Sequence, residues 1–221
     1  MNIKLFFSVI FISTLLFLFP FLTYSQETTV VQLPPPQKSG GKPLMEALNK
    51  RESLKSFSSE KIPLQTLSNL LWAAWGINRP DIGKRTAPSG RNEQEIDIYV
   101  VISEGVFLYD AKEHSLKQIV KENLQNVISK QKEVIAAPVN LVFVADYARM
   151  AKTPENEKDF FSAVDTGYIS QNVYLFCASE GLATFAYHGV DRPVVAEKMK
   201  LRPGQKIILG QAVGYPEKAG N

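Results

Sequence analysis

The segment formed by residues 50–57 carries the first side chains that could do chemistry. Arg51, Ser53 and Lys55 alternate along it, so an extended chain would aim all three toward the same side. A guanidinium can fork onto a phosphate and a hydroxyl can donate to one, so this combination suits an anion. A solvated basic turn is the alternative, and the residues alone leave both open.

A second segment, residues 87–94, contains Pro88, Ser89, Gly90 and Asn92. These residue types fix turns and present backbone donors. Such a loop could hold a ligand, but a plain turn before the next strand would need the same residues.

A third segment, residues 181–190, contains Gly189 and His188, one of only two histidines. Without a side chain, Gly189 would let the backbone approach a flat ring closely. No Ser/Asp partner pattern and no metal-ligand spacing accompany His188, so a hydrolase triad and a metal site are poor interpretations. The sequence also has no Gly-x-Gly-x-x-Gly motif and no P-loop.

The elements that must position these segments follow from hydrophobic spacing. Apolar residues three and four apart predict helices over residues 43–48, 63–75, 116–128, 159–180 and 194–199. Strands are predicted over residues 96–102, 106–109, 139–145, 184–187 and 207–213. The almost wholly apolar strand 139–145 should lie inside the sheet, and Gly181 should end the longest helix. Helices and strands mixed around a hairpin favour an α+β fold.

The first 25 residues are typical of a signal peptide. Lys4 precedes an uncharged run from Leu5 to Leu22, and Thr23 and Ser25 suit the −3 and −1 positions of a cleavage site. We therefore expect an exported protein of the bacterial periplasm. An uncleaved N-terminal membrane anchor is the alternative, since the run is nearly long enough to span a bilayer. Residues 26–42, rich in Pro and Gly, are predicted to be a linker outside the core, and residues 43–221 to be one domain.

The composition narrows the class of partner. The formal net charge is only +3 and no basic stripe with interleaved aromatic residues occurs, which argues against a nucleic-acid partner. The single cysteine, Cys177, lies in an apolar stretch and is predicted to be a buried thiol rather than a nucleophile. His114 lies in a charged turn and is predicted to be on the surface.

Taken together, the three segments resemble the nitroreductase family. Residues 50–57 are similar to its Arg-x-Ser-x-Arg/Lys-x-Phe motif, residues 88–94 to its Pro-Ser-x-x-Asn-x-Gln loop, and residues 181–189 to its late Gly-Leu…Gly segment. Residues 71–80, residues 85–89 and the closing Gly-Tyr-Pro at 214–216 resemble the SagB/thiazole-oxidase type of dehydrogenase within it. The resemblance covers about residues 43–218, in the family's order and spacing.

The resemblance implies a nitroreductase-like α+β sandwich, in which helices flank a mostly antiparallel central sheet, and an intertwined homodimer with FMN at the interface. Arg51 and Ser53 would hold the FMN phosphate, and Lys55 would lie near the N1–C2=O edge of the ring and tune its redox chemistry. The loop at Pro88 and Ser89 would come from the other subunit. The full set of cofactor-binding residues that it implies is Arg51, Glu52, Ser53, Lys55, Pro88, Ser89, Asn92, Ala186, Tyr187, His188, Gly189 and Lys218.

The activity implied is a ping-pong transfer of electrons from a reductant such as NAD(P)H to small nitroaromatic or quinone-type electrophiles, without a metal and with no catalytic side chain identified. Two departures from the family pattern stand out. Only Lys218 could supply the basic residue that many members carry in a longer C-terminal tail, and Ile96 replaces the usual aromatic residue after the Pro-Ser loop. The alternatives are an azoline-type peptide oxidase and a non-catalytic FMN-binding or interaction protein.

Overall fold

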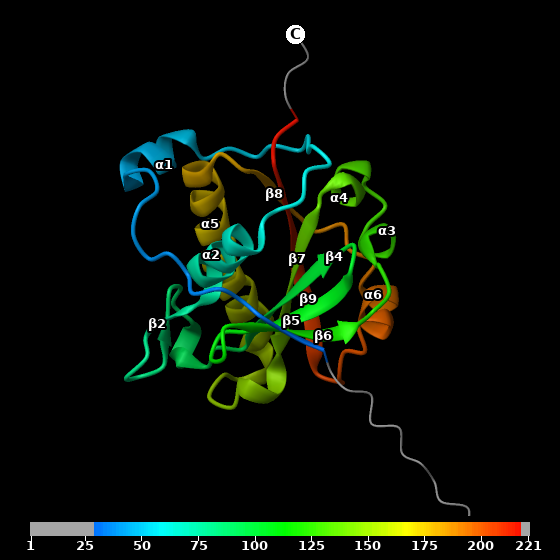
Figure 1. Cartoon of the computed structure of the whole chain (residues 1–221). Coiled ribbons are helices and arrows are strands. Elements are labelled where there is room, and N and C mark those ends of the chain that lie inside the picture. Colours follow the sequence, from blue (N-terminus) through cyan, green and yellow to red (C-terminus); the bar gives the residue numbers. More distant parts are fainter. Residues whose placement is uncertain (1–28, 218–221) are drawn as a thin grey trace, which may run out of the picture.

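A seven-stranded antiparallel sheet forms the centre of the molecule (Figure 1). The structure is a computed structural model and describes residues 29–217, so the predicted signal peptide and Lys218 lie outside the described residues. The strand order is β1-β6-β5-β4-β7-β9-β8. The strands are β1 (Val30–Gln32), β4 (Ile96–Ile102), β5 (Gly105–Asp110), β6 (Ser115–Val120), β7 (Val139–Asp146), β8 (Ala183–Tyr187) and β9 (Gln205–Gly214).

Helices cover both faces of this sheet (Figure 1). On one face lie α2 (Leu64–Trp75) and α5 (Lys158–Glu180), with α1 (Leu44–Lys50) packed on α5. The other face carries three short helices, α3 (Gln125–Ile128), α4 (Lys132–Ala136) and α6 (Arg192–Lys198). A small ribbon of β2 (Ile77–Arg79) and β3 (Lys84–Arg85) stands apart from the sheet. The predicted α+β class and antiparallel sheet are confirmed. Within residues 29–217 no helix is long and apolar enough to cross a membrane.

Alternating side chains of the central strands build two cores, one on each face of the sheet. Ile98 and Phe143 belong to the core under α2 and α5, whereas Tyr99 and Val142 belong to the core under the short helices. All eight residues of β7 are buried, which explains the nearly continuous apolar run in its sequence.

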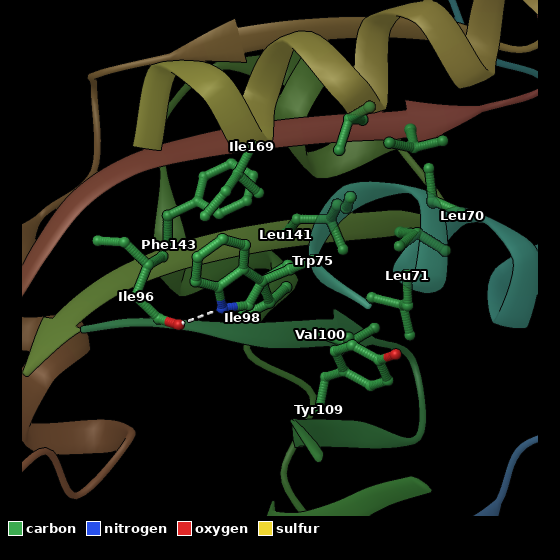
Figure 2. Packing of buried hydrophobic residues seen from close by; sticks show 14 of the residues in the cluster. Leu70, Leu71, Trp75, Ile96, Ile98, Val100, Tyr109, Leu141, Phe143 and Ile169 are labelled. Carbon is green, nitrogen blue, oxygen red and sulfur yellow. Dashed lines mark hydrogen bonds between the residues drawn. The ribbon is translucent and has the colours of Figure 1, made fainter. Parts of the chain in front are cut away.

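Trp75 ties α2 to the start of β4 (Figure 2). Its indole ring is buried among Ile98, Leu141 and Phe143, and its Nε1–H donates to the carbonyl of Ile96 at 2.7 Å. The ring therefore fills the core while its one polar group keeps a partner, as a buried tryptophan requires.

The C-terminal end of α5 sets the position of β8. Gly181 adopts a left-handed conformation with φ of 72°, and its N–H donates to the carbonyl of Cys177. A side chain would strain this backbone, so the predicted glycine stop is confirmed. The chain then reverses directly into β8, which pairs with β9 at the end of the sheet.

The helix predicted over residues 116–128 is wrong. Residues 115–120 form β6, which pairs with β5 on one side and with β1 on the other, and only Gln125–Ile128 is helical. The spacing of the apolar residues fitted a helix, but pairing with the preceding strand β5 and with the distant strand β1 decided the conformation. The turn before β6 did carry a signal, because the Asp110 side chain accepts from the N–H groups of Lys112 and Glu113, as in an Asx turn.

The linker predicted for residues 26–42 is partly built into the fold, which corrects that prediction. Val30–Gln32 form β1, and Leu33 is buried in the core under α2. The Ser68 hydroxyl donates to the carbonyl of Pro34 at 2.6 Å. The short apolar run before the prolines therefore packs this N-terminal arm, residues 30–34, against the domain.

His114 is also not the surface residue that was predicted. Its Nε2 lies 2.7 Å from the Ser68 hydroxyl and its Nδ1 lies 3.1 Å from the Tyr109 hydroxyl. Partial burial lowers the pKa of His114. The neutral ring therefore joins the N-terminal arm, α2 and β5.

Candidate functional site

The Arg-Ser-Lys segment runs along the open edge of β8. The chain leaves α1 in an extended conformation at Arg51, and the N–H of Leu54 donates to the carbonyl of Thr184 at 3.0 Å. The guanidinium carbon of Arg51 lies 5.5 Å from the centre of the Tyr174 ring, and Nζ of Lys55 lies 5.5 Å from the centre of the Phe185 ring. The structure thus brings these two cations to one strip formed by β8 and the end of α5.

Tyr174 connects the Arg-Ser-Lys segment to β8. It was not predicted as a site residue. Its hydroxyl lies 3.0 Å from Ser53 Oγ and accepts a hydrogen bond from the N–H of Ala186 at 2.8 Å. One side chain of α5 therefore contacts both the first and the third segment singled out in the sequence. The sequence did show a hydroxyl-bearing side chain, Tyr174, within the apolar part of α5, but it does not identify the partner of that hydroxyl.

The charges on this strip are not neutralised by the protein. Lys50 pairs with Glu46 at 2.8 Å, whereas within residues 29–217 neither Arg51 nor Lys55 forms an ion pair with a carboxylate. Glu52 beside them is exposed. Arg51 and Ser53 both contact Tyr174, and an uncommitted guanidinium beside a hydroxyl suits a phosphate monoester.

A cavity of about 330 Å³ opens beside Arg51. It lies between the extended segment, the end of α5 and β8, and its walls include Arg51, Leu54, Tyr174, Cys177 and Thr184. Cys177 is completely buried, and burial raises the pKa of its thiol. The predicted buried thiol is confirmed, and Cys177 provides packing rather than a thiolate.

The Pro-Ser loop is held in a rare backbone conformation. Arg91, Asn92 and Gln94 all have positive φ values, of 52°, 56° and 50°. Ser89 stabilises the loop, because its Oγ accepts from the N–H of Gln94 at 3.1 Å, while Pro88 and Asn92 are exposed. Strained backbone of this kind is common at functional sites, where surrounding contacts keep it in place.

A buried acid pair lies under the Pro-Ser loop. The Asp165 carboxylate accepts the N–H of Gly90 at 2.7 Å. Glu95 is fully buried, and neither of its carboxyl oxygens has a hydrogen-bond partner among the described residues. Burial and the neighbouring Asp165 raise the pKa of Glu95 to about 7. A protonated Glu95 leaves this buried pair with at most one negative charge, which burial tolerates better than two.

One protomer keeps the Pro-Ser loop apart from the Arg-Ser-Lys strip. The loop is anchored at Asp165 and the strip at Tyr174, nine residues apart on α5. Nine helical residues rise by about 13 Å and turn through roughly half a revolution, so the two anchors lie on opposite sides of the helix. A single protomer therefore does not bring Ser89 and Ser53 together.

The late segment reaches the strip mainly through its backbone. Ala186 is half-buried in β8, whereas His188 and Gly189 follow the strand and are exposed. The Tyr187 side chain is buried on the far side, where its hydroxyl donates to Asn140 Oδ1 at 3.1 Å. Burial also raises the pKa of Tyr187, so this phenol is a core group. Within residues 29–217 no three His, Cys, Asp or Glu side chains gather as metal ligands.

Comparison with known proteins agrees with this fold. The sequence pattern of the nitroreductase family matches residues 48–215. A nitroreductase-family protein of Methanocaldococcus jannaschii is 28% identical in an alignment of 193 residues that covers 83% of this chain and 96% of that protein. A crystal structure of a nitroreductase-family protein from Ralstonia eutropha superposes with a TM-score of 0.81 at 37% identity, over 86% of this chain and 90% of that one.

A more distant structural relative occurs in the microcin synthetase complex of Escherichia coli. It superposes with a TM-score of 0.68 at 20% identity, over 85% of this chain and 78% of that one, and at this identity it shows the fold alone. The family pattern spans most of the domain, and the Ralstonia structure shares the sheet and its flanking helices. This chain belongs to the nitroreductase family.

Proposed function

We propose that the protein is an FMN-dependent oxidoreductase that transfers electrons from a reductant such as NAD(P)H to small electrophiles of the nitroaromatic or quinone type. The observation that carries the proposal is the strip of Arg51, Ser53 and Lys55, whose cations lack carboxylate partners within the described chain. Arg51 of this strip also lines a cavity of about 330 Å³. Family membership supports the same class, since nitroreductases generally bind FMN.

Each part of the strip has a proposed role toward FMN. Arg51 and Ser53 hold the phosphate, and Glu52 lies between them. Lys55 places a positive charge near the ring and favours electron uptake. The flavin supplies the hydride and electron chemistry when bound, and the protein supplies binding, orientation and electrostatics. The backbone of Ala186, Tyr187, His188 and Gly189 lines the electron-exchanging edge, and Lys218 is proposed as a further phosphate contact.

We propose a homodimer in which Pro88, Ser89 and Asn92 of the other subunit complete the site. The separation of the two segments on α5 supports this arrangement, because one protomer does not join them. The surface supports it as well: Met45 of α1 is 75% exposed, and Phe160 and Tyr168 of α5 are 65% and 48% exposed. Exposed apolar side chains on neighbouring helices are typical of subunit interfaces.

The subgroup, the electron donor and the location are also proposals. The SagB-type interpretation rests on residues 71–80, 85–89 and 214–216, and one chain of the microcin synthetase complex shares the fold with this chain. An azoline-type peptide oxidase is therefore the second candidate function. With a cleaved signal peptide over residues 1–25 the enzyme would work in the periplasm, where NAD(P)H is scarce and another small-molecule donor would replace it. An uncleaved leader would instead anchor it to the membrane.

The first test is the flavin content of the purified protein. We expect flavin absorbance as isolated, or saturable binding on titration with FMN, and bleaching of the bound flavin on mixing with a suitable donor. NADH and NADPH are compared first, and a set of quinones and nitroaromatics then serves as acceptors. A colourless protein that does not bind added FMN would exclude the oxidoreductase and leave an interaction protein. The mass of the exported form gives the leader cleavage site.

A further inference from the structure

The chain makes a tight turn immediately after β8. The N–H of Val190 donates to the carbonyl of His188 at 2.8 Å, which closes a turn centred on Gly189. The N–H groups of His188 and Gly189 donate to no acceptor within residues 29–217, and both residues are exposed. The turn therefore presents two unused backbone donors at the end of the strip.

Arg192 holds this turn from the side of β9. Its guanidinium donates to the carbonyls of His188 at 3.3 Å, Ile207 at 2.9 Å and Ile208 at 3.0 Å. Arg192 forms no ion pair with a carboxylate of the described chain. A full positive charge is thus directed at three backbone carbonyls, one of which belongs to the turn.

Ser129 holds the same turn from the opposite side. Its side chain is buried, and its Oγ donates to the carbonyl of Gly189 at 2.8 Å. Ser129 also pairs with Val190 as an isolated antiparallel bridge, and its Oγ accepts from the N–H of Gln131 at 3.2 Å. Both carbonyls of the turn are therefore fixed, one by α6 and one by the segment between α3 and α4.

The peptide group between His188 and Gly189 contains both the carbonyl that faces Arg192 and the N–H that is unused. A cation that donates to the carbonyl polarises this peptide and makes its N–H a stronger donor. We propose that Arg192 and Ser129 are positioning residues that clamp the turn and direct the Gly189 N–H at the N5 edge of the flavin. This inference rests on the proposed function.

The redox consequence has a definite sign. Oxidised flavin has a lone pair at N5 that accepts a hydrogen bond, whereas reduced flavin carries a hydrogen there. A strong donor fixed at N5 therefore stabilises the oxidised form relative to the reduced form. Loss of the clamp should shift relative affinity toward reduced FMN.

The experiment measures the dissociation constants of oxidised and reduced FMN, and the midpoint potential, for the full chain and four variants. We expect Arg192→Gln and Ser129→Ala to change the ratio of the two constants about tenfold in favour of reduced FMN, which raises the two-electron midpoint potential by about 30 mV. Arg192→Lys keeps the charge but cannot span three carbonyls, so its ratio should be intermediate. Lys198→Gln removes a cation from the same helix, away from the turn, and should match the wild type.

Three outcomes separate the two proposals. A shifted ratio in the Arg192 and Ser129 variants, with Lys198→Gln unchanged, supports the clamp. FMN binding by the wild type with an unchanged ratio in both variants, even if both affinities fall together, overturns the clamp and leaves the proposed function standing. A wild-type chain that binds neither form of FMN overturns the proposed function and the clamp with it.

Discussion

Glu95 should make the stability of this protein fall as the pH rises through neutrality. The side chain is fully buried at the start of β4, beside Asp165 of α5. Arg149 donates to the backbone carbonyl of Glu95 and pairs with Asp97 at 2.8 Å, so it offsets only part of the cost of burying a charged Glu95. Burial and Asp165 raise the pKa of Glu95 from 4.5 to about 7.

The sign and size follow from the two pKa values. The folded protein binds this proton more tightly than the unfolded chain, so the stabilisation is complete below pH 4.5 and is lost as the pH rises through about 7. The difference between these values corresponds to a loss of up to about 3 kcal/mol of unfolding free energy. Relaxation of nearby dipoles around a charged Glu95 would make the loss smaller.

Glu95→Gln removes the ionisation and keeps the shape of the side chain. Urea denaturation between about pH 5 and pH 8 should show the unfolding free energy of the wild type falling by up to about 3 kcal/mol more than that of the variant. Glu60→Gln, at an exposed position, is the control and should follow the wild type. If the wild-type and Glu95→Gln curves run parallel, the buried protonated acid is not there.

Three further predictions concern the strip and the proposed interface. Arg51→Ala should weaken FMN binding by roughly 1.5–3 kcal/mol, the range for a charged hydrogen bond, and an unchanged affinity on titration would remove Arg51 from the site. Tyr174→Phe should cost about 1 kcal/mol of unfolding free energy, because the N–H of Ala186 loses its acceptor; equal urea midpoints would contradict this. Tyr168→Arg, on the exposed face of α5, should give monomers that lose flavin on gel filtration, and a flavin-bound monomer would refute the shared site.

The elements with the strongest local pattern were predictable from the sequence. The apolar run of β7 and the spacing of three and four in α2 reflect one-sided or complete burial, which local sequence encodes directly. Gly181 marked the end of α5 because only a residue without a side chain adopts its φ without strain. The three segments that form the strip and the Pro-Ser loop were also predictable, because each is a short local pattern of chemically matched residues.

The parts that depend on distant contacts were not predictable. β6 became a strand between β5, its neighbour in the chain, and β1, which is distant in sequence, and the apolar spacing within β6 does not encode the distant partner. The Tyr174 hydroxyl contacts both Ser53 and Ala186, and Ser53 is more than a hundred residues away in the sequence. The residues around Tyr174 give no indication of these partners. The acid pair of Glu95 and Asp165 is equally hidden, because its protonation depends on burial that only the folded chain produces.

Both edges of the sheet are covered by other segments, which protects the sheet from pairing with other chains. A bare edge strand offers a row of unpaired amides and carbonyls, to which a second molecule can add and start aggregation. Here the three residues of β1 cover β6 at one edge, and the N–H of Leu54 takes up a carbonyl of β8 at the other. A chain shortened to begin after Leu33 would expose β6, so its first defect should be poor solubility rather than a change in redox chemistry.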